Sequence, residues 1–147
     1  MSPVYDTRVQ KKAEVAFAVD ISRALDLSMI QTPDFSHDDW VAWKKRKMIA
    51  RCELKCREYL AGHFEDYMID AAKIDNCRAL AKKHGVPFWL FVRWINEDWY
   101  LDYRLPEGEH YPRRMGGRTD RGDPDDWELQ EFIPNSVFRV MRTTRKP

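Results

Sequence analysis

Ile49-Ala50-Arg51-Cys52-Glu53-Leu54-Lys55-Cys56-Arg57 is the stretch around which this chain of 147 residues is organised. It is a short apolar run with an acid and a base placed two residues apart near its end. Side chains on an extended strand alternate between two faces, so Glu53, Lys55 and Arg57 project together. The two cysteines and the leucine between them project to the opposite face. We therefore predict a strand with one face for packing and one for chemistry.

A partner strand is predicted directly upstream, where His37-Asp38-Asp39-Trp40-Val41-Ala42-Trp43 begins with acids and continues with strand-forming residues. Lys44-Lys45-Arg46-Lys47 is a polar connection short enough to join the two strands as a hairpin. The hairpin would bring an aspartate and Glu53 toward one point.

Carboxylates gathered at one point are what a hard divalent cation needs, because Mg²⁺ binds carboxylate oxygens and keeps most of its waters for a substrate phosphate. We expect Asp39, or its neighbour Asp38, to serve with Glu53 in this way. Lys55 would then lie beside the metal-bound water. The motif is short, and the alternative is an ordinary amphipathic hairpin with a charged outer face.

The composition is that of a globular protein, with 44% hydrophobic, 13% aromatic and 33% charged residues. The length fits one domain covering residues 1–147. No apolar run approaches the roughly 18 residues that a membrane span requires, and the start of the chain has no signal pattern. We expect a soluble protein in the cytoplasm, which is the host cytoplasm if a phage encodes it.

The net charge of +1 means that affinity for nucleic acid must come from local patches, and basic residues cluster at 44–47 and 113–121. Three cysteines do not form a disulfide framework and suit a reducing compartment. A zinc site on Cys52 and Cys56 is disfavoured because four residues along a strand span about 13 Å. We expect these cysteines to pack in the core.

An amphipathic helix is predicted over residues 6–27, followed by a loop over 28–36. Apolar residues recur at spacings of three and four, at Val9, Ala13, Ala16, Phe17, Ile21, Ala24 and Leu25. Glu14 falls on or beside this stripe, so it is either a solvated edge residue or a side chain that points into the site.

A second helix is predicted over residues 65–84, acidic at its start and stopped by Gly85-Val86-Pro87. Lys73 falls on its apolar stripe, and Tyr67 lies about one turn earlier. Lys73 either extends along the edge of the core to reach solvent or reaches a site. Tyr67 would support the same site.

Residues 87–95 are almost continuously hydrophobic and aromatic, which predicts a strand buried on both faces, and 99–103 return as an antiparallel strand. A polar loop is predicted over 106–126, where arginines and glycines either grip nucleic acid or are balanced by interleaved acids. Residues 127–133 are expected to form an added edge strand. Helix, hairpin, strand, helix, strand and strand in this order predict a mixed sheet flanked by helices.

The motif residues resemble those of the PD-(D/E)XK nuclease superfamily, with Asp39 as the aspartate and Glu53-Leu54-Lys55 as the E-x-K. Small phage-type members also resemble this chain near its end, where Gly-Gly-Arg, Asp-Arg-Gly-Asp and Phe-Ile-Pro follow the predicted sheet. The resemblance implies an α/β, restriction-endonuclease-like core in αβββαβ order, with an added C-terminal edge strand. The doubled Asp38-Asp39 departs from the pattern, and Asp34 after Pro33 is a further alternative for the aspartate.

The resemblance also implies a Mg²⁺- or Mn²⁺-dependent DNA endonuclease, acting in phage DNA repair, recombination or degradation. The implied metal ligands are Asp39 or Asp38, Glu53, the Leu54 carbonyl and Glu14. The implied catalytic set is Lys55, Glu53, Asp39, Glu14 and Lys73, and the implied nucleic-acid contacts are Lys73, Tyr67, Arg57, Arg118 and Arg121.

Double-stranded, branched or single-stranded DNA is the expected partner. The alternative is a nucleic-acid-binding or interaction module that keeps the fold without cleaving. Surplus tryptophans such as Trp40, Trp43 and Trp99 suit a homodimer face or a core equally well.

Overall fold

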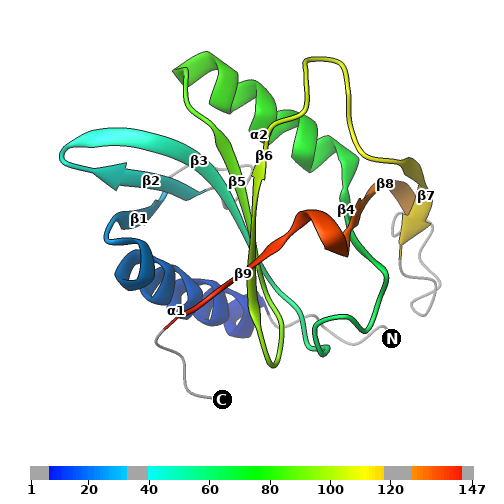
Figure 1. The fold of residues 1–147 in the computed structure, drawn as a ribbon, viewed down its shortest axis with the longest axis horizontal. Helices are drawn as coiled ribbons and strands as arrows, with labels where there is room; N and C mark the ends of the chain where they lie inside the picture. Colours follow the sequence, from blue (N-terminus) through cyan, green and yellow to red (C-terminus); the bar gives the residue numbers. More distant parts are fainter. Residues whose placement is uncertain (1–6, 33–39, 118–126, 144–147) are drawn as a thin grey trace.

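The computed structural model describes residues 7–32, 40–117 and 127–143 (Figure 1). Its elements, in chain order, are α1 (Thr7–Leu25), β1 (Ser28–Gln31), β2 (Trp40–Lys44), β3 (Lys47–Cys56), β4 (Asp66–Asp70), α2 (Ala71–His84), β5 (Phe88–Arg93), β6 (Asp98–Tyr103), β7 (Arg113–Gly117), β8 (Trp127–Pro134), the short 3₁₀ helix η2 (Asn135–Val137) and β9 (Arg139–Met141). None of the helices in these ranges is long and apolar enough to cross a membrane.

The larger sheet has the strand order β1-β2-β3-β5-β6-β9. Strands β3 and β5 are parallel, and every other neighbouring pair in this sheet is antiparallel. The predicted mixed sheet in αβββαβ order is confirmed by α1, β1, β2, β3, α2 and β5, with β4 inserted before α2. The C-terminal edge strand of this sheet is β9, which pairs with β6.

The predicted hairpin is confirmed, with β2 paired antiparallel to β3. Its connection is tighter than the predicted four residues, because Lys44 and Lys47 pair with each other and only Lys45 and Arg46 form the turn. The alternation predicted for β3 is also present, since Cys52 and Leu54 are 1% exposed and pack with residues of α1. Glu53 therefore projects to the opposite face of the sheet.

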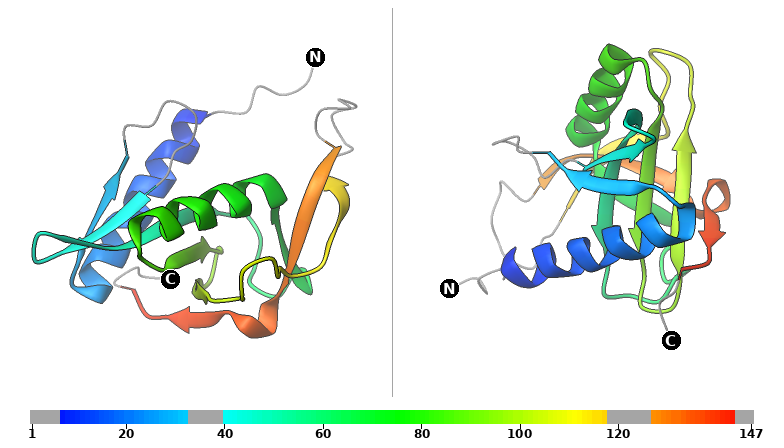
Figure 2. Two further views of the ribbon diagram at one scale, coloured as in Figure 1. Left: turned by 90° about the horizontal axis from the view of Figure 1, so that it is seen from above. Right: turned by 90° about the vertical axis from the view of Figure 1, so that its left-hand side faces the viewer.

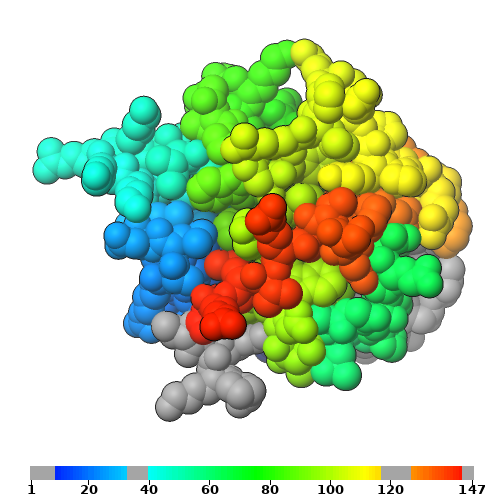
Figure 3. Space-filling model, viewed as in Figure 1, coloured from blue at the N-terminus to red at the C-terminus, as the bar shows by residue number. Residues whose placement is uncertain are grey.

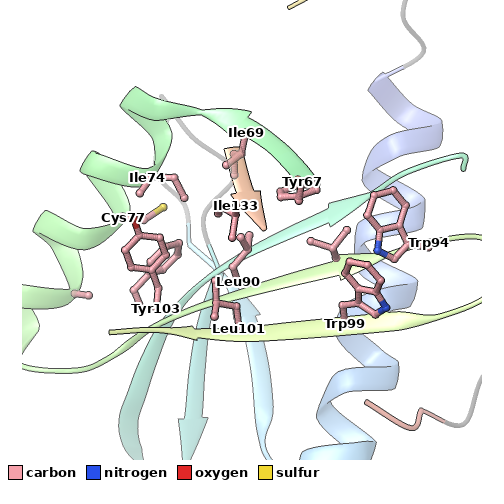
Figure 4. Close-up of a cluster of buried hydrophobic side chains, with 13 residues drawn as sticks. Tyr67, Ile69, Ile74, Cys77, Leu90, Trp94, Trp99, Leu101, Tyr103 and Ile133 are labelled. Carbon is pink, nitrogen blue, oxygen red and sulfur yellow. The ribbon is translucent and has the colours of Figure 1, made fainter. Parts of the chain in front are cut away.

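The helices cover opposite faces of the larger sheet (Figure 2). Phe17 and Ile21 of α1 pack with Leu54 and Phe91 in one cluster of buried side chains. On the other face, residues of α2, of the smaller sheet and of β5 and β6 form a second cluster (Figure 4). The predicted burial of 87–95 on both faces is confirmed, because Leu90 joins the second cluster and Phe91 the first.

The predicted helix over 6–27 is present, but the buried part of its apolar stripe is shorter than the sequence pattern suggested. Phe17, Ala18 and Ile21 are buried, whereas Val9 is 58% and Leu25 40% exposed, so the helix packs through its middle. Helical periodicity identifies the apolar stripe but does not show how far the sheet beneath it extends.

Two predicted segments were wrong in secondary structure. The loop predicted over 28–36 contains β1, which pairs antiparallel with β2. The helix predicted from residue 65 begins only at Ala71, because Asp66–Asp70 is strand β4. The Asp70 carboxylate accepts a hydrogen bond from the Ala72 amide and caps α2, which fixes the later start.

The predicted loop over 106–126 contains strand β7, and β8 does not lie at the edge of the main sheet as predicted. Instead, β8 is the middle strand of a second sheet with the order β4-β8-β7. A polar, glycine-containing segment gives little sequence signal for a strand, and alternation within β8 could not reveal which strands it would pair with.

A buried polar network joins this smaller sheet to the rest of the molecule. Glu131 on β8 is 0% exposed, and its carboxylate accepts hydrogen bonds from the Tyr103 hydroxyl at 2.6 Å and from Arg113 Nε at 2.9 Å. Arg113 also donates to both carboxylate oxygens of Asp75 on α2, at 2.6 and 3.1 Å. The hydrogen bonds from Arg113 lower the pKa of Asp75 below its ordinary value.

Replacing Arg113 with leucine should destabilise the fold by about 3–5 kcal/mol, because it leaves a fully buried carboxylate without its cation. Urea denaturation at neutral pH, followed by tryptophan fluorescence, measures this change. Arg104→Leu is the matched control, since the Arg104 side chain is 76% exposed and its pair with Asp102 should contribute less than about 1 kcal/mol. Equal stability losses in the two variants would contradict the structural role of Arg113.

All three cysteines are free thiols, as expected. Cys52 and Cys77 are buried, and burial raises the pKa of the partly buried Cys56 thiol to about 11. Cys56 therefore carries little thiolate at neutral pH, and the buried Cys52 and Cys77 serve as packing residues.

Candidate active site

A cleft of about 440 Å³ lies on the α2 side of β3. Its lining comes from α1, β3, β4, α2 and β8, and consists of Gln10, Glu14, Glu53, Lys55, Arg57, Met68, Ile69, Asp70, Lys73 and Gln130. The alternation of β3 explains why its three charged residues face one space. Five separate elements therefore contribute side chains to a predominantly polar cleft.

Glu53 is the most buried charged residue of this cleft, at 2% exposed. One carboxylate oxygen, Oε1, lies 3.2 Å from Lys55 Nζ, and the other, Oε2, lies 3.2 Å from Lys73 Nζ. A buried carboxylate is tolerated when cations and hydrogen bonds offset its lost hydration. The two lysines supply that compensation from a strand and from a helix.

Lys55 is held as a cation by this arrangement. Burial acts to lower its pKa, but the nearby Glu53 carboxylate acts in the opposite direction, and the net effect is a pKa raised above the ordinary lysine value. Its side chain is 31% exposed, so the ammonium group remains accessible from the cleft. Lys55 can therefore place a full positive charge beside a bound anion.

Lys73 reaches the cleft because α2 begins close to it. Asp70 caps the helix and itself lines the cleft, which puts the third helical residue near Glu53. The Lys73 side chain is 14% exposed and ends at Glu53, so it does not extend to solvent. Of the two alternatives that the sequence left open, the structure brings Lys73 into the site.

Glu14 also lines the cleft, from α1, together with Gln10 one turn earlier. The alternative of a fully solvated edge residue is thereby excluded for Glu14. Glu14 from a helix and Glu53 from a strand consequently border the same space, as does Asp70 from β4. Oxygen donors of this kind match the preference of a hard divalent cation.

Arg57 lines the cleft at the end of β3, and its guanidinium lies 5.4 Å from the centre of the Tyr67 ring. Tyr67 was predicted on a helix and in contact with nucleic acid, and the structure corrects both predictions. It lies on β4, is 2% exposed and meets Trp94 and Phe138 edge-on. Its ring holds Arg57 through a cation–π contact. Because the ring is buried, it is not accessible to a ligand.

Five cleft residues were not anticipated from the sequence: Gln10, Met68, Ile69, Asp70 and Gln130. Gln10 lies four residues before Glu14, so helical spacing could have identified it. The others lie on or beside β4 and β8, where the predicted elements or their positions were wrong. No local sequence signal marks them.

Asp38, Asp39, Arg118 and Arg121 lie outside the described residues, as does the alternative Asp34. Within the described ranges, no group of three or more histidine, cysteine, aspartate or glutamate side chains is placed to hold a metal ion. The described part of β2 begins at Trp40, which pairs with Cys52, the residue before Glu53. The backbone of Leu54 lies between the two charged residues of the E-x-K, and its side chain is buried.

The mixed sheet, its flanking helices and the acid-lysine cleft define a restriction-endonuclease-like protein. Hjc, a Holliday junction resolvase from the archaeal hyperthermophile Archaeoglobus fulgidus, shares this fold with a TM-score of 0.50 and 17% sequence identity. The match covers 66% of this chain and 78% of that chain. A comparison with curated proteins found no match.

A family model described as "Phage putative PDDEXK endonuclease" matches residues 1–141. The chain therefore belongs to this family of phage PD-(D/E)XK endonucleases, which confirms the resemblance drawn from Glu53-Leu54-Lys55.

Proposed function

We propose that this protein is a divalent-metal-dependent endonuclease that hydrolyses phosphodiester bonds in DNA. The observation that carries the proposal is Glu53, a carboxylate 2% exposed at the cleft, with an ammonium group 3.2 Å from each of its oxygens. The carboxylates of Glu53 and Glu14, which line the same cleft, suit a metal ion. The two lysines beside Glu53 suit a phosphate.

The donors fit Mg²⁺ or Mn²⁺. Glu53 and Glu14 line one cleft, the Leu54 carbonyl is the intervening backbone oxygen, and Asp39 or Asp38 is proposed as the remaining carboxylate. A bound ion would supply a Lewis acid for a phosphate oxygen and an activated water. Glu14 would hold a second ion, either directly or through a water molecule.

The roles proposed for the basic residues follow from their charge and position. Lys55 stabilises the negative charge that develops on the phosphate oxygens during hydrolysis. Its raised pKa keeps it a cation in this role. Lys73 binds a phosphate from the helix side. Arg57 lies at the end of β3, where it can grip the next phosphate of the same strand.

Contacts of this kind read the phosphate backbone and carry no base information. We therefore propose low sequence specificity. Because the structurally similar Hjc is a Holliday junction resolvase, branched DNA belongs among the substrates to test. Arg118 and Arg121 are proposed as further backbone contacts, and a homodimer as the assembly.

The aspartate assignment gives a direct test of the function. Asp39→Asn should reduce Mg²⁺-dependent nicking of supercoiled plasmid by about a hundredfold or more, since a lost ligand removes several kcal/mol of metal-based stabilisation. Asp38→Asn, one residue away, should retain nicking if Asp39 is the ligand, and the reverse pattern would assign the ligand to Asp38. Chelation with EDTA should abolish nicking in every case, and the same assay on single-stranded and branched DNA ranks the substrates.

The alternative is a DNA-binding module on the same fold, and the two ion pairs of Glu53 favour it. Both oxygens of Glu53 already face lysines, so the buried carboxylate is compensated without a metal ion. The nicking assay separates the two functions. If the wild-type protein binds DNA but never nicks it with Mg²⁺ or Mn²⁺, the binding module is the correct function.

A further inference from the structure

The tip of the β2–β3 hairpin carries four consecutive basic residues, Lys44, Lys45, Arg46 and Lys47, all of them exposed. Figures 1 and 3 show the hairpin extending beyond the body of the molecule. None of the four forms an ion pair with a described residue. Lys44, Lys45 and Arg46 line a hollow beside the tip, in which Asp26 is the one carboxylate among the lining residues. The tip therefore carries a concentrated positive charge.

The turn holds these side chains in an unfavourable backbone conformation. Lys45 has φ 51° and Arg46 has φ 63°, both in the left-handed region. Two-residue hairpin turns with both residues there are best made by Asn-Gly or Asp-Gly, because residues with larger side chains are strained at positive φ. Lys45 and Arg46 therefore make the hairpin less stable than an Asn-Gly turn would.

The tip lies on the same strand as the candidate active site. Lys47 begins β3 and Glu53 is six residues further along it, which corresponds to about 20 Å at the rise of an extended strand. A register shift between Ala42 and Trp43 of the partner strand lies between these points, and irregularities of this kind bend a strand. In duplex DNA, about 20 Å corresponds to roughly six base pairs.

We propose that the tip of the β2–β3 hairpin is a second DNA-binding site, which holds the phosphate backbone of a duplex about six base pairs from the bond bound in the cleft. This inference rests on the proposed function for the identity of the polyanion as DNA. It explains why basic residues occupy a strained turn that lies outside the cleft. Four flexible cations on a projecting ribbon suit a duplex arm leaving the cleft.

The test replaces the turn with one that favours the hairpin. The double variant Lys45→Asn, Arg46→Gly should raise the melting temperature, because the turn strain is removed. It should also weaken binding of a fluorescein-labelled DNA duplex by about tenfold and reduce the slope of log Kd against log salt by about two. Binding is measured by anisotropy without divalent cations, so that cleavage does not interfere.

The double variant Arg139→Ala, Arg142→Ala is the matched control, since it removes two exposed charges from the β9 end of the chain and should leave Kd and its salt dependence near wild type. If the turn variant binds DNA with the wild-type Kd and salt slope, the proposal is overturned and the tip is only a solvated turn.

A series of duplex lengths tests the link with the cleft. Wild type and the turn variant should differ on duplexes long enough to reach both sites and converge on shorter ones. A loss of equal size at every length would overturn a shared duplex. Loss of binding in the turn variant, in a protein that never nicks DNA, would support the tip site while contradicting the proposed endonuclease.

Discussion

Replacing Lys55 with methionine is expected to reduce metal-dependent DNA nicking by about 10²–10³-fold, while DNA binding changes by less than about threefold. Methionine is an unbranched side chain nearly as long as lysine, and it carries no charge. The ammonium of Lys55 lies 3.2 Å from Glu53 and is 31% exposed, so it can stabilise charge that develops on a phosphate during hydrolysis. That charge is greater in the transition state than in the bound substrate, so the effect should fall on kcat.

Single-turnover cleavage of a labelled duplex measures the rate, and anisotropy without metal measures Kd. Lys82→Met is the control, because Lys82 also pairs with a glutamate, Glu107 at 2.6 Å, but its side chain is 70% exposed and outside the cleft. Equal kcat values for wild type and the Lys55 variant would remove Lys55 from the chemistry. A loss confined to Kd would make it a binding residue only.

The part of the site that could be predicted from the sequence is the part encoded on one strand. Alternation along β3 is a local property, and it placed Glu53, Lys55 and Arg57 together before any tertiary contact was considered. Lys73 was identified because a charged residue on an apolar stripe is conspicuous. Its contact with Glu53 across the cleft depends on where α2 begins, and the sequence pattern located that start about six residues too early.

The part that could not be predicted is the smaller sheet and the cleft wall that it forms. Tyr67 and Ile69 alternate with exposed residues, which is a strand pattern, but the acidic start and basic end of 65–84 resembled one long helix. Pairing of β4 with β8 joins residues sixty or more positions apart, and no local periodicity encodes such a partner. Met68 and Gln130 could therefore be placed at the cleft only by the structure.

The largest effect is expected for Glu53→Gln, which keeps the shape of the side chain and removes its charge. Metal-dependent nicking should fall by about a thousandfold, because losing a ligand removes several kcal/mol of Lewis-acid stabilisation. The metal-free protein should also be destabilised, since Lys55 and Lys73 would face each other across a neutral amide. The loss should be smaller than the about 3–5 kcal/mol of a fully buried broken pair, because Lys55 is partly exposed.

Thermal unfolding with and without Mg²⁺ separates metal binding from structural damage. Mg²⁺ should raise the melting temperature of the wild-type protein, because a ligand that binds only the folded state stabilises it, and should not raise that of Glu53→Gln. Glu131→Gln is the matched control, a second carboxylate that is fully buried and paired with an arginine, but that does not itself line the cleft. It should be destabilised and still respond to Mg²⁺. A Mg²⁺ shift in Glu53→Gln as large as that of the wild type would show that the ion binds elsewhere.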